Sequence, residues 1–162
     1  YTALGQAFDQ ANCWGQYYYE TSTRYAELTD DVIDVMVEHL GRRTSPATAI
    51  LTYRLDEAYS EVEPDANAFG GSREPQYNTF LMAIAPDAEV LSADRAWARG
   101  MRDALAPIAF NAGTYVNAMA EQEEHRVRAA YGAKYDRLAR IKAEYDPGNV
   151  FRLNQNIKPS PR

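Results

Sequence analysis

Hydrophobic residues recur at intervals of three and four in two segments of the first two thirds of the chain. The first segment lies between Thr29, a typical helix-capping residue, and Gly41, a typical helix stop. The second runs from Ser92 to Pro107, where it ends because proline cannot continue a helix. Both segments are therefore predicted to be amphipathic helices with one face packed against the rest of the protein.

Stretches rich in aromatic and β-branched residues lie on either side of these helices and predict strands. The predicted strands are residues 12–20, 48–53, 66–69, 77–84 and a short one at 113–116. Alternation in the first would place Tyr17 and Tyr19 on one face and Tyr18 on the other. A turn at Gly70 and Gly71 would join the third and fourth as a hairpin.

Few helices and frequent hairpins favour an α+β fold, an antiparallel sheet with helices packed on one face. The other face would then meet water, pack against another chain or domain, or line a pocket. The last third differs, because residues 119–131 and 134–145 have helical spacing and are separated by Gly132. Residues 146–148 end the second of these helices, and residues 150–159 show no periodicity. We expect a helical and irregular carboxy-terminal tail.

The 162 residues correspond to one domain, or one domain with a tail, and their composition is that of a folded protein. The net charge of −6 argues against nucleic acid as a partner. No apolar run reaches the ~18 residues of a membrane span, and the first residues do not resemble a signal peptide. We expect a soluble protein without a membrane partner; the compartment stays open, with the cytoplasm slightly favoured.

Residue chemistry by itself identifies no catalytic centre. His39 and His125 have no cysteine pair beside them, so no metal site is expected. Cys13, the single cysteine, is interpreted as a packed residue rather than a reactive thiol. There is no nucleophile motif, no G-x-G-x-x-G turn and no phosphate-binding loop. This reasoning stops at an α+β domain with a tyrosine-rich sheet.

The carboxy-terminal third resembles a known family. The blocks that carry the resemblance, in order and at family spacing, are residues 113–117, 126–132, 135–138, 142–151 and 154–157. They are similar to the berberine-bridge segment that closes FAD-linked oxidoreductases of the vanillyl-alcohol oxidase type. The chain follows the family pattern from about Ser45 to Pro159, and the likeness is loose before that. The start at Tyr1 rather than Met is interpreted as a cut from a longer protein or as a processed start.

The resemblance implies a substrate-domain portion at residues 1–113 and a berberine-bridge-like segment at 114–162. An amino-terminal FAD-binding domain would lie outside this chain, act as its partner and hold most of the FAD. Such enzymes transfer a hydride from an alcohol or amine carbon of a small-molecule substrate to FAD. Carried over residue by residue, the flavin-facing positions are Tyr115, Asn117, Asn154 and Asn156.

One position departs from the family pattern. Many members have a second tyrosine after the Tyr-x-Asn element that helps to take a proton from the substrate, whereas this chain has Ala118. Either this member's chemistry needs no such base or another group serves. The candidates from the sequence are the sheet tyrosines, with an arginine to lower a tyrosine pKa: Tyr17, Tyr19, Tyr53, Tyr77 and Arg73.

Two alternatives stay open at this point. The chain could be a free-standing α+β module that binds a ligand or dimerises through its uncovered sheet face. It could also be a catalytically silent relative, an interpretation that depends on Ala118 alone. An isolated substrate domain would expose an apolar face, so we expect self-association as a homodimer or a larger species.

Overall fold

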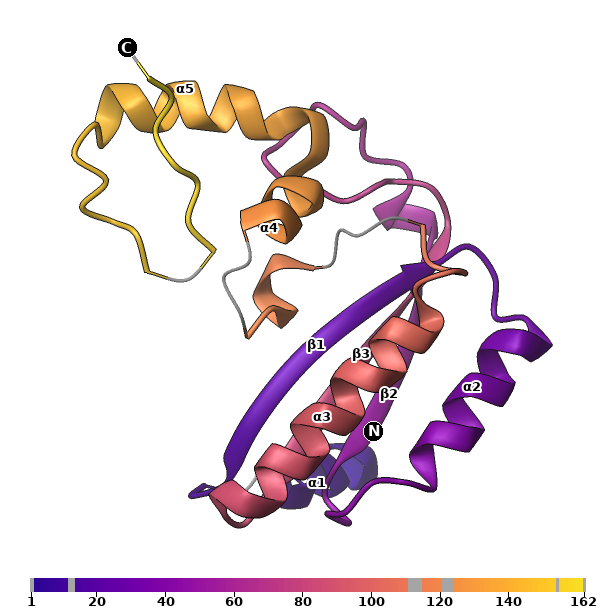
Figure 1. Cartoon of the computed structure of the whole chain (residues 1–162). Coiled ribbons are helices and arrows are strands. Elements are labelled where there is room, and N and C mark those ends of the chain that lie inside the picture. Colours follow the sequence, from indigo (N-terminus) through magenta and orange to yellow (C-terminus); the bar gives the residue numbers. More distant parts are fainter. Residues whose placement is uncertain (1, 12–13, 111–114, 121–123, 154, 162) are drawn as a thin grey trace.

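The computed structural model describes residues 2–11, 14–110, 115–120, 124–153 and 155–161, which build an antiparallel sheet with attached helices (Figure 1). The strands are β1 (Tyr17–Tyr25), β2 (Ala49–Leu55) and β3 (Gln76–Ala85). Their order is β1-β3-β2, and both pairings are antiparallel. The predicted α+β class is confirmed.

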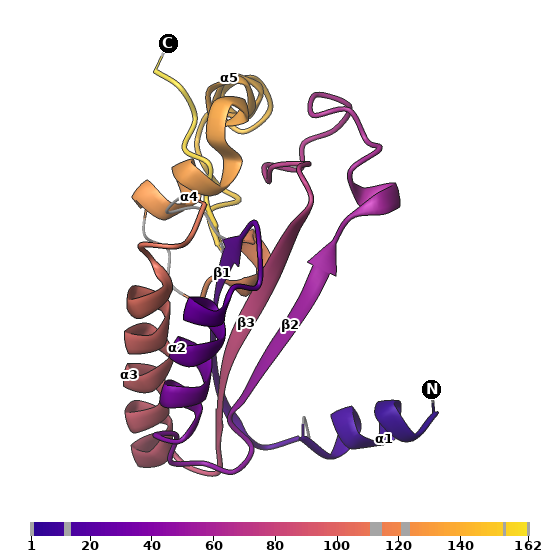
Figure 2. The same ribbon diagram turned by 90° about the vertical axis from the view of Figure 1, so that its right-hand side faces the viewer.

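Two helices cover one face of this sheet. They are α2 (Asp30–Leu40) and α3 (Ala88–Leu105), which lie together on one side of the strands in Figure 2. The core between sheet and helices is dominated by large apolar side chains, namely Tyr19, Tyr25, Leu81, Val32, Trp97, Met101 and Leu105. Burying such side chains is the main stabilising contribution to a layer of this kind.

Hydrogen bonds stabilise both ends of α2, one of them through a side chain of α3. Thr29 caps α2 by accepting a hydrogen bond from the Val32 backbone nitrogen, as its sequence position predicts. The Trp97 indole on α3 donates to the His39 carbonyl at 2.6 Å, which ties α3 to the last turn of α2. The two helices are thereby held side by side against one sheet face.

The first strand lies further along the chain than predicted. It runs over residues 17–25 rather than 12–20, and residues 12–13 lie outside the described part. The polar run from Thr21 to Arg24 was not expected in a strand, yet every residue from Tyr17 to Tyr25 pairs with β3. The aromatic run marked only the start of the strand, because strand formation depends on the partner as much as on propensity. The preceding helix α1 (Thr2–Ala11) was not predicted.

The predicted hairpin is wrong, because residues 66–69 do not form a strand. They belong to a long loop between β2 and β3 whose regular part is the 3₁₀ helix η1 (Glu57–Tyr59). The Lys134 ammonium donates to carbonyl oxygens of Pro64, Asn67 and Phe69 and so holds this loop against the carboxy-terminal helices. The hydrogen bonds of these loop carbonyl groups are thus supplied by a side chain rather than by a neighbouring strand.

The carboxy-terminal third has its own small core. It contains the 3₁₀ helix η2 (Val116–Ala118), α4 (Glu124–Tyr131), the 3₁₀ turn η3 (Gly132–Lys134) and α5 (Tyr135–Tyr145). Met119, Val127, Tyr135 and Ala139 pack together, with Ile157 of the tail beside them. The short strand predicted at 113–116 is wrong at Val116, which is helical, and residues 113–114 lie outside the described part. Helix 119–131 was predicted too long, since α4 begins at Glu124 and Met119 is extended.

Candidate functional site

The face of the sheet opposite α2 and α3 carries a row of polar side chains. Asn78 on the central strand pairs with Arg24 on one side and with Tyr53 on the other. Paired residues in an antiparallel sheet point to the same face, so the three side chains stand side by side across all three strands. Figure 2 shows α2 and α3 together on the other side of the strands. We call the sheet face that carries Arg24, Asn78 and Tyr53 the open face.

A hollow of about 240 Å³ lies over this row. Its polar members are Arg24 and Asn78, and its aromatic members are Tyr53, Tyr59, Phe69 and Tyr115. The aromatic rings are in contact with one another. Tyr53 stacks on Phe80 with ring centroids 5.5 Å apart, and Tyr115 meets Phe80 edge-on at 6.3 Å and Phe69 at 6.4 Å. We call this hollow the open-face pocket.

Arg24 is the buried charge of the open-face pocket, with only 7% of its surface exposed. Burial lowers the pKa of its guanidinium, while the neighbouring hydroxyl of Tyr59, which it hydrogen-bonds, raises it in part. Gly71 lies directly against the Arg24 side chain. A Cβ atom at residue 71 would overlap Arg24 Nη1 and would lie 2.6 Å from the Phe69 ring. A glycine is needed there for the loop to pass so close.

Asn78 is 1% exposed, and only half of its amide is used. Its Nδ2 lies 3.4 Å from the Tyr53 hydroxyl, to which it donates. Its Oδ1 has no hydrogen-bond partner among the residues that the structure describes. An unpaired buried carbonyl oxygen is costly, so this atom is a ready acceptor for a ligand hydrogen.

The open face holds one carboxylate, Glu20, within its three described strands. The Tyr18 hydroxyl donates to Glu20 Oε2 at 3.0 Å. Burial raises the pKa of Glu20, and the hydrogen bond from Tyr18 only partly offsets this effect. Burial also raises the pKa of Tyr18, and the negative charge of Glu20 adds to that effect. The sequence reasoning missed this pair because residue 20 was placed at the end of its strand.

The sheet tyrosines chosen from the sequence lie on both faces. Tyr17, Tyr19 and Tyr77 are on the helix-covered face by register, with Tyr19 buried in the core, whereas Tyr53 points into the open-face pocket. Burial raises the pKa of Tyr53, so its phenol is a hydrogen-bond donor rather than a base near neutral pH.

Arg73 lies outside the polar row. It stacks over the Tyr59 and Phe69 rings, 4.9 and 4.6 Å from their centroids, and it donates to the Asn67 side chain at 3.2 Å. Burial raises the pKa of Tyr59, and the charges of Arg24 and Arg73 offset this effect only in part. Arg73 therefore shapes the loop wall of the open-face pocket.

Two of the proposed flavin-facing positions, Tyr115 and Asn117, lie at the same pocket. Tyr115 lines it, and Asn117 Nδ2 donates to the Tyr115 hydroxyl at 2.8 Å. Asn154 lies outside the described residues. Asn156 is half-buried, and its Oδ1 has no partner within the described ranges. A second hollow of about 290 Å³ continues from Arg24 and Tyr115 past Asn117 to Ile157.

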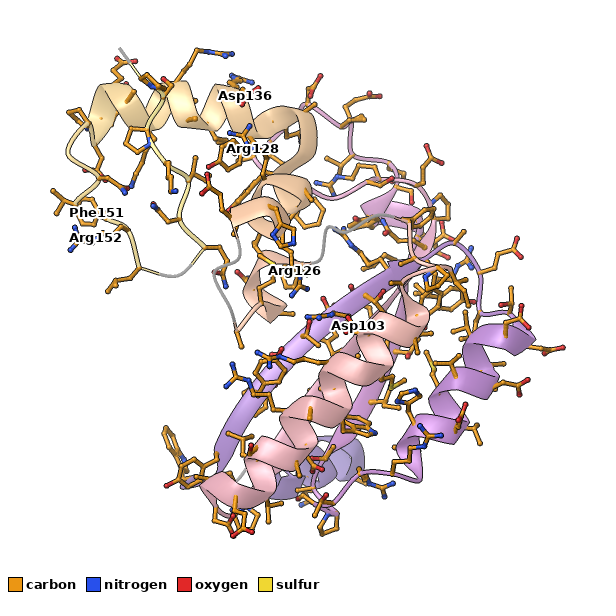
Figure 3. The ribbon with its side chains drawn as sticks, in the orientation of Figure 1. Asp103, Arg126, Arg128, Asp136, Phe151 and Arg152 are labelled. Atoms are coloured by element: carbon orange, nitrogen blue, oxygen red, sulfur yellow. The ribbon has the colours of Figure 1, made fainter. Side chains whose placement is uncertain are left out.

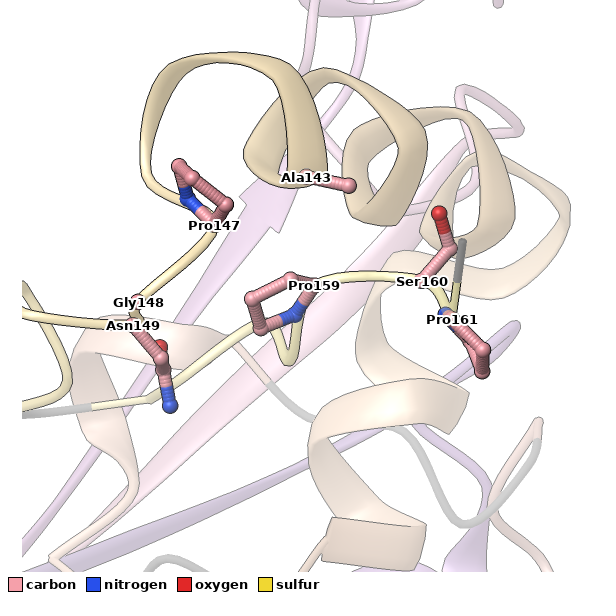
Figure 4. Close-up of a pocket in the computed structure, with 7 residues that line it drawn as sticks. All are labelled: Ala143, Pro147, Gly148, Asn149, Pro159, Ser160 and Pro161. Atoms are coloured by element: carbon pink, nitrogen blue, oxygen red, sulfur yellow. The ribbon is translucent and has the colours of Figure 1, made fainter.

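The end of the chain presents apolar side chains to solvent. Phe151 is 81% and Leu153 is 84% exposed, and Figure 3 shows Phe151 and Arg152 at the outer edge of the molecule. The loop is nevertheless ordered by the Asp146 carboxylate, which accepts from the backbone nitrogens of Val150 at 2.7 Å and Phe151 at 3.1 Å. A hollow between this loop and the tail is lined by Ala143, Pro147 and Pro159 (Figure 4). It contains no ionisable side chain and lies apart from the open-face pocket.

Among the described residues there is no cluster of three or more His, Cys, Asp or Glu side chains able to hold a metal ion. No helix in the same ranges is long and apolar enough to cross a membrane.

Comparison with known proteins gives one consistent result. Residues 114–158 match the family model "Berberine and berberine like". The chain is 33% identical over 132 residues to the FAD-linked oxidoreductase YvdP of Bacillus subtilis, covering 82% of this chain and 29% of that protein. It is 27% identical over 161 residues to an FAD-linked oxidoreductase of Dictyostelium discoideum, covering 98% of this chain and 34% of that protein. The chain thus spans about a third of the length of these relatives.

A solved structure agrees at the level of the fold. Berberine bridge enzyme from Eschscholzia californica superposes with a TM-score of 0.78 at 16% identity, over 98% of this chain and 36% of that one. Such low identity supports the fold alone.

Proposed function

Because the chain belongs to the berberine-bridge-like FAD-linked oxidoreductases, we propose that it forms the substrate-binding and flavin-covering part of such an enzyme. In this proposal a separate amino-terminal domain holds most of the FAD. The reaction takes a hydride from an alcohol or amine carbon of a small molecule bound over the open face. The Tyr115 side chain carries the proposal, since it lines the open-face pocket and also belongs to the Tyr-x-Asn element expected at the flavin.

Neutral amides of the carboxy-terminal segment suit a flavin ring. Asn156 Oδ1 and Gln155 Oε1 are buried acceptors without partners among the described residues, and Asn117 adds a neutral amide beside Tyr115. Such groups match the donors and acceptors of the flavin ring without adding a charge. When bound, FAD would supply the hydride acceptor.

The proton of the substrate needs a separate acceptor. Ala118 is 1% exposed and has no ionisable group, so the usual family position cannot serve. We assign the role to Glu20, the carboxylate of the open face, because burial raises its pKa toward the range useful for a general base. The Tyr18 hydroxyl would orient it.

The exposed apolar loop after α5 supports a partner domain. Phe151 and Leu153 are held outward on an ordered loop rather than packed on this chain. Large apolar side chains displayed in this way are typical of an interface. We assign this interface to the FAD-binding domain, as the family resemblance implies.

The test compares FAD binding by the 162-residue chain with binding by the chain extended through the residues encoded upstream. We expect a flavin absorption spectrum only from the longer protein. In that protein, Glu20→Gln should keep the flavin spectrum but slow flavin reduction by an oxidisable alcohol or amine about 100-fold or more. The wild-type rate should fall as the pH drops through the raised pKa of Glu20.

Asn156→Leu should weaken FAD binding in the longer protein, whereas Gln6→Leu, which removes an exposed amide on α1, should not. The proposal fails if neither length binds FAD, in which case a free-standing ligand-binding or dimerisation module is the alternative. An unchanged reduction rate in Glu20→Gln would remove Glu20 from the reaction while leaving the flavin assignment intact.

A further inference from the structure

We propose that the open-face pocket recognises an aromatic carboxylic acid, with Arg24 pairing to its carboxylate, the tyrosine and phenylalanine rings enclosing its ring, and Asn78 accepting a hydrogen bond from its hydroxyl or amino group. This inference names the substrate class of the proposed oxidoreductase and so rests on that function. Neither the family model nor the relatives reported above specify such a substrate.

The buried charge of Arg24 is the first observation. The groups of the described residues that act on this charge are the hydroxyls of Tyr59 and Tyr53, and none of them is a carboxylate. A buried guanidinium without an anion is costly and is usually paired. Its planar fork matches the two oxygens of a carboxylate. Arg24 is therefore prepared for an anionic ligand group.

Glu20, the carboxylate that the described strands place on the open face, lies too far along β1 to serve as that anion. Glu20 precedes Arg24 by four residues in β1, which corresponds to about 13 Å between their Cα atoms in an extended strand. It is also engaged with the Tyr18 hydroxyl on the side away from Arg24.

The aromatic walls determine the rest of the ligand. Tyr53, Tyr59, Phe69 and Tyr115 surround a hollow of about 240 Å³, small enough to favour a single substituted ring. Ring contacts in stacked or edge-on geometry stabilise such a ligand beyond the burial of its area. A free inorganic anion would leave these walls in contact with water.

Asn78 supplies the third contact. Its side chain is almost wholly buried beside Arg24 and Tyr53, and its Oδ1 is unpaired within the described part of the chain. A ligand hydroxyl or amino group can donate to this oxygen and remove the cost of leaving it unsatisfied. The expected ligand is therefore a ring that carries both an anionic group and a hydrogen-bond donor.

The test titrates the 162-residue chain with 4-hydroxybenzoate, with its neutral amide 4-hydroxybenzamide and with inorganic phosphate, followed by NMR of the Arg24 Nε–H signal. We expect 4-hydroxybenzoate to shift this signal and to bind about tenfold or more tightly than the amide. Phosphate should bind more weakly than 4-hydroxybenzoate because it leaves the rings uncovered.

Arg24→Met should abolish the preference for the carboxylate. The matched control is Arg54→Met, which removes an equal charge from β2 at the other edge of the sheet, where Arg54 is exposed and paired with Asp56 at 2.7 Å. Gly71→Ala should weaken binding of the acid without changing the charge, because its methyl group would displace both the Arg24 guanidinium and the Phe69 ring. If Arg24→Met fails to fold, the affinities of the wild-type chain for 4-hydroxybenzoate and for 4-hydroxybenzamide still test whether the pocket prefers a carboxylate.

Equal affinity for acid and amide, or no shift of the Arg24 signal, would overturn the inference. Because the titration contains no flavin, its result is independent of whether the longer protein binds FAD. If the chain prefers the acid and neither the short nor the long protein binds FAD, the pocket would still recognise an aromatic carboxylic acid, but as part of a binding module rather than of an oxidoreductase.

Discussion

At the scale of single residues, Asp94 is a buried carboxylate that organises the turn before β2. It accepts hydrogen bonds from the Thr44 nitrogen at 2.6 Å, the Ser45 nitrogen at 2.9 Å and the Thr48 hydroxyl at 2.5 Å. Burial alone would raise the pKa of Asp94, but these three residues outweigh it and hold the pKa below its ordinary value. The charged form is thus the one that the fold stabilises.

Asp94→Asn should lower the free energy of unfolding by about 2–4 kcal/mol near neutral pH. The substitution removes the charge and points an amide NH₂ group at backbone nitrogens that are themselves donors. Because the folded pKa is depressed, the contribution of Asp94 is complete above the unfolded pKa of about 4 and is lost as the pH falls through the folded value. Urea unfolding at several pH values should show the gap between wild type and variant closing in acid.

The control is Asp103→Asn on the same helix, where an exposed carboxylate pairs with Arg102 at 2.8 Å. Exposed pairs contribute about 0–1 kcal/mol, so this variant should be close to wild type. A gap for Asp94→Asn that persists undiminished in acid would contradict the assignment.

At the scale of elements, the loop between β2 and β3 forms one wall of the open-face pocket without strand pairing. Lys134 bonds three of its carbonyl groups. Gly70 packs so closely on the backbone of Ala130 that a Cβ would not fit there. The loop is therefore held in place by the junction of α4 and α5 rather than by the sheet.

Lys134→Met should release this loop while leaving the sheet intact. Hydrogen exchange followed by mass spectrometry should show amides of residues 60–72 exchanging at least about tenfold faster, because local opening then costs less free energy. Amides of β1 and β3 should keep their protection. Lys158→Met, which removes an exposed ion pair with Glu124 at 2.6 Å, is the control and should leave the loop unchanged. Equal exchange in Lys134→Met and wild type would show that Lys134 does not anchor the loop.

At the scale of the whole molecule, large side chains are left exposed at Tyr18 and Tyr53 of the open face and on the loop that carries Phe151 and Leu153. The isolated chain should therefore associate as dimers or larger species at high concentration, as light scattering can measure. The double variant Phe151→Asp with Leu153→Asp should lower the average mass. Arg152→Asp changes the net charge by the same amount in the same loop and should not.

A wild-type chain that stays monomeric at high concentration would contradict this prediction. An equal fall in mass for Arg152→Asp would show that charge, not apolar contact, drives the association.

The sequence by itself determined the elements whose signals are local. Helical periodicity bounded by Thr29 and Gly41 predicted α2, and the run ending at Pro107 predicted most of α3. The ordered blocks after residue 113 predicted the family, which the comparisons confirm. These features depend on neighbours within a few residues, so they can be recognised without a structure.

Features that depend on distant partners could be seen only in the folded chain. The polar run from Thr21 to Arg24 is a strand because β3 pairs with it, whereas residues 66–69 are a loop because Lys134 takes their carbonyl groups. The pairing also buried Tyr19 and turned Tyr53 toward the pocket. It set Arg24 beside Asn78, 54 residues away in the chain, which no local pattern could indicate. Strand register and burial are set by contacts across the sheet, and those contacts exist only in the folded chain.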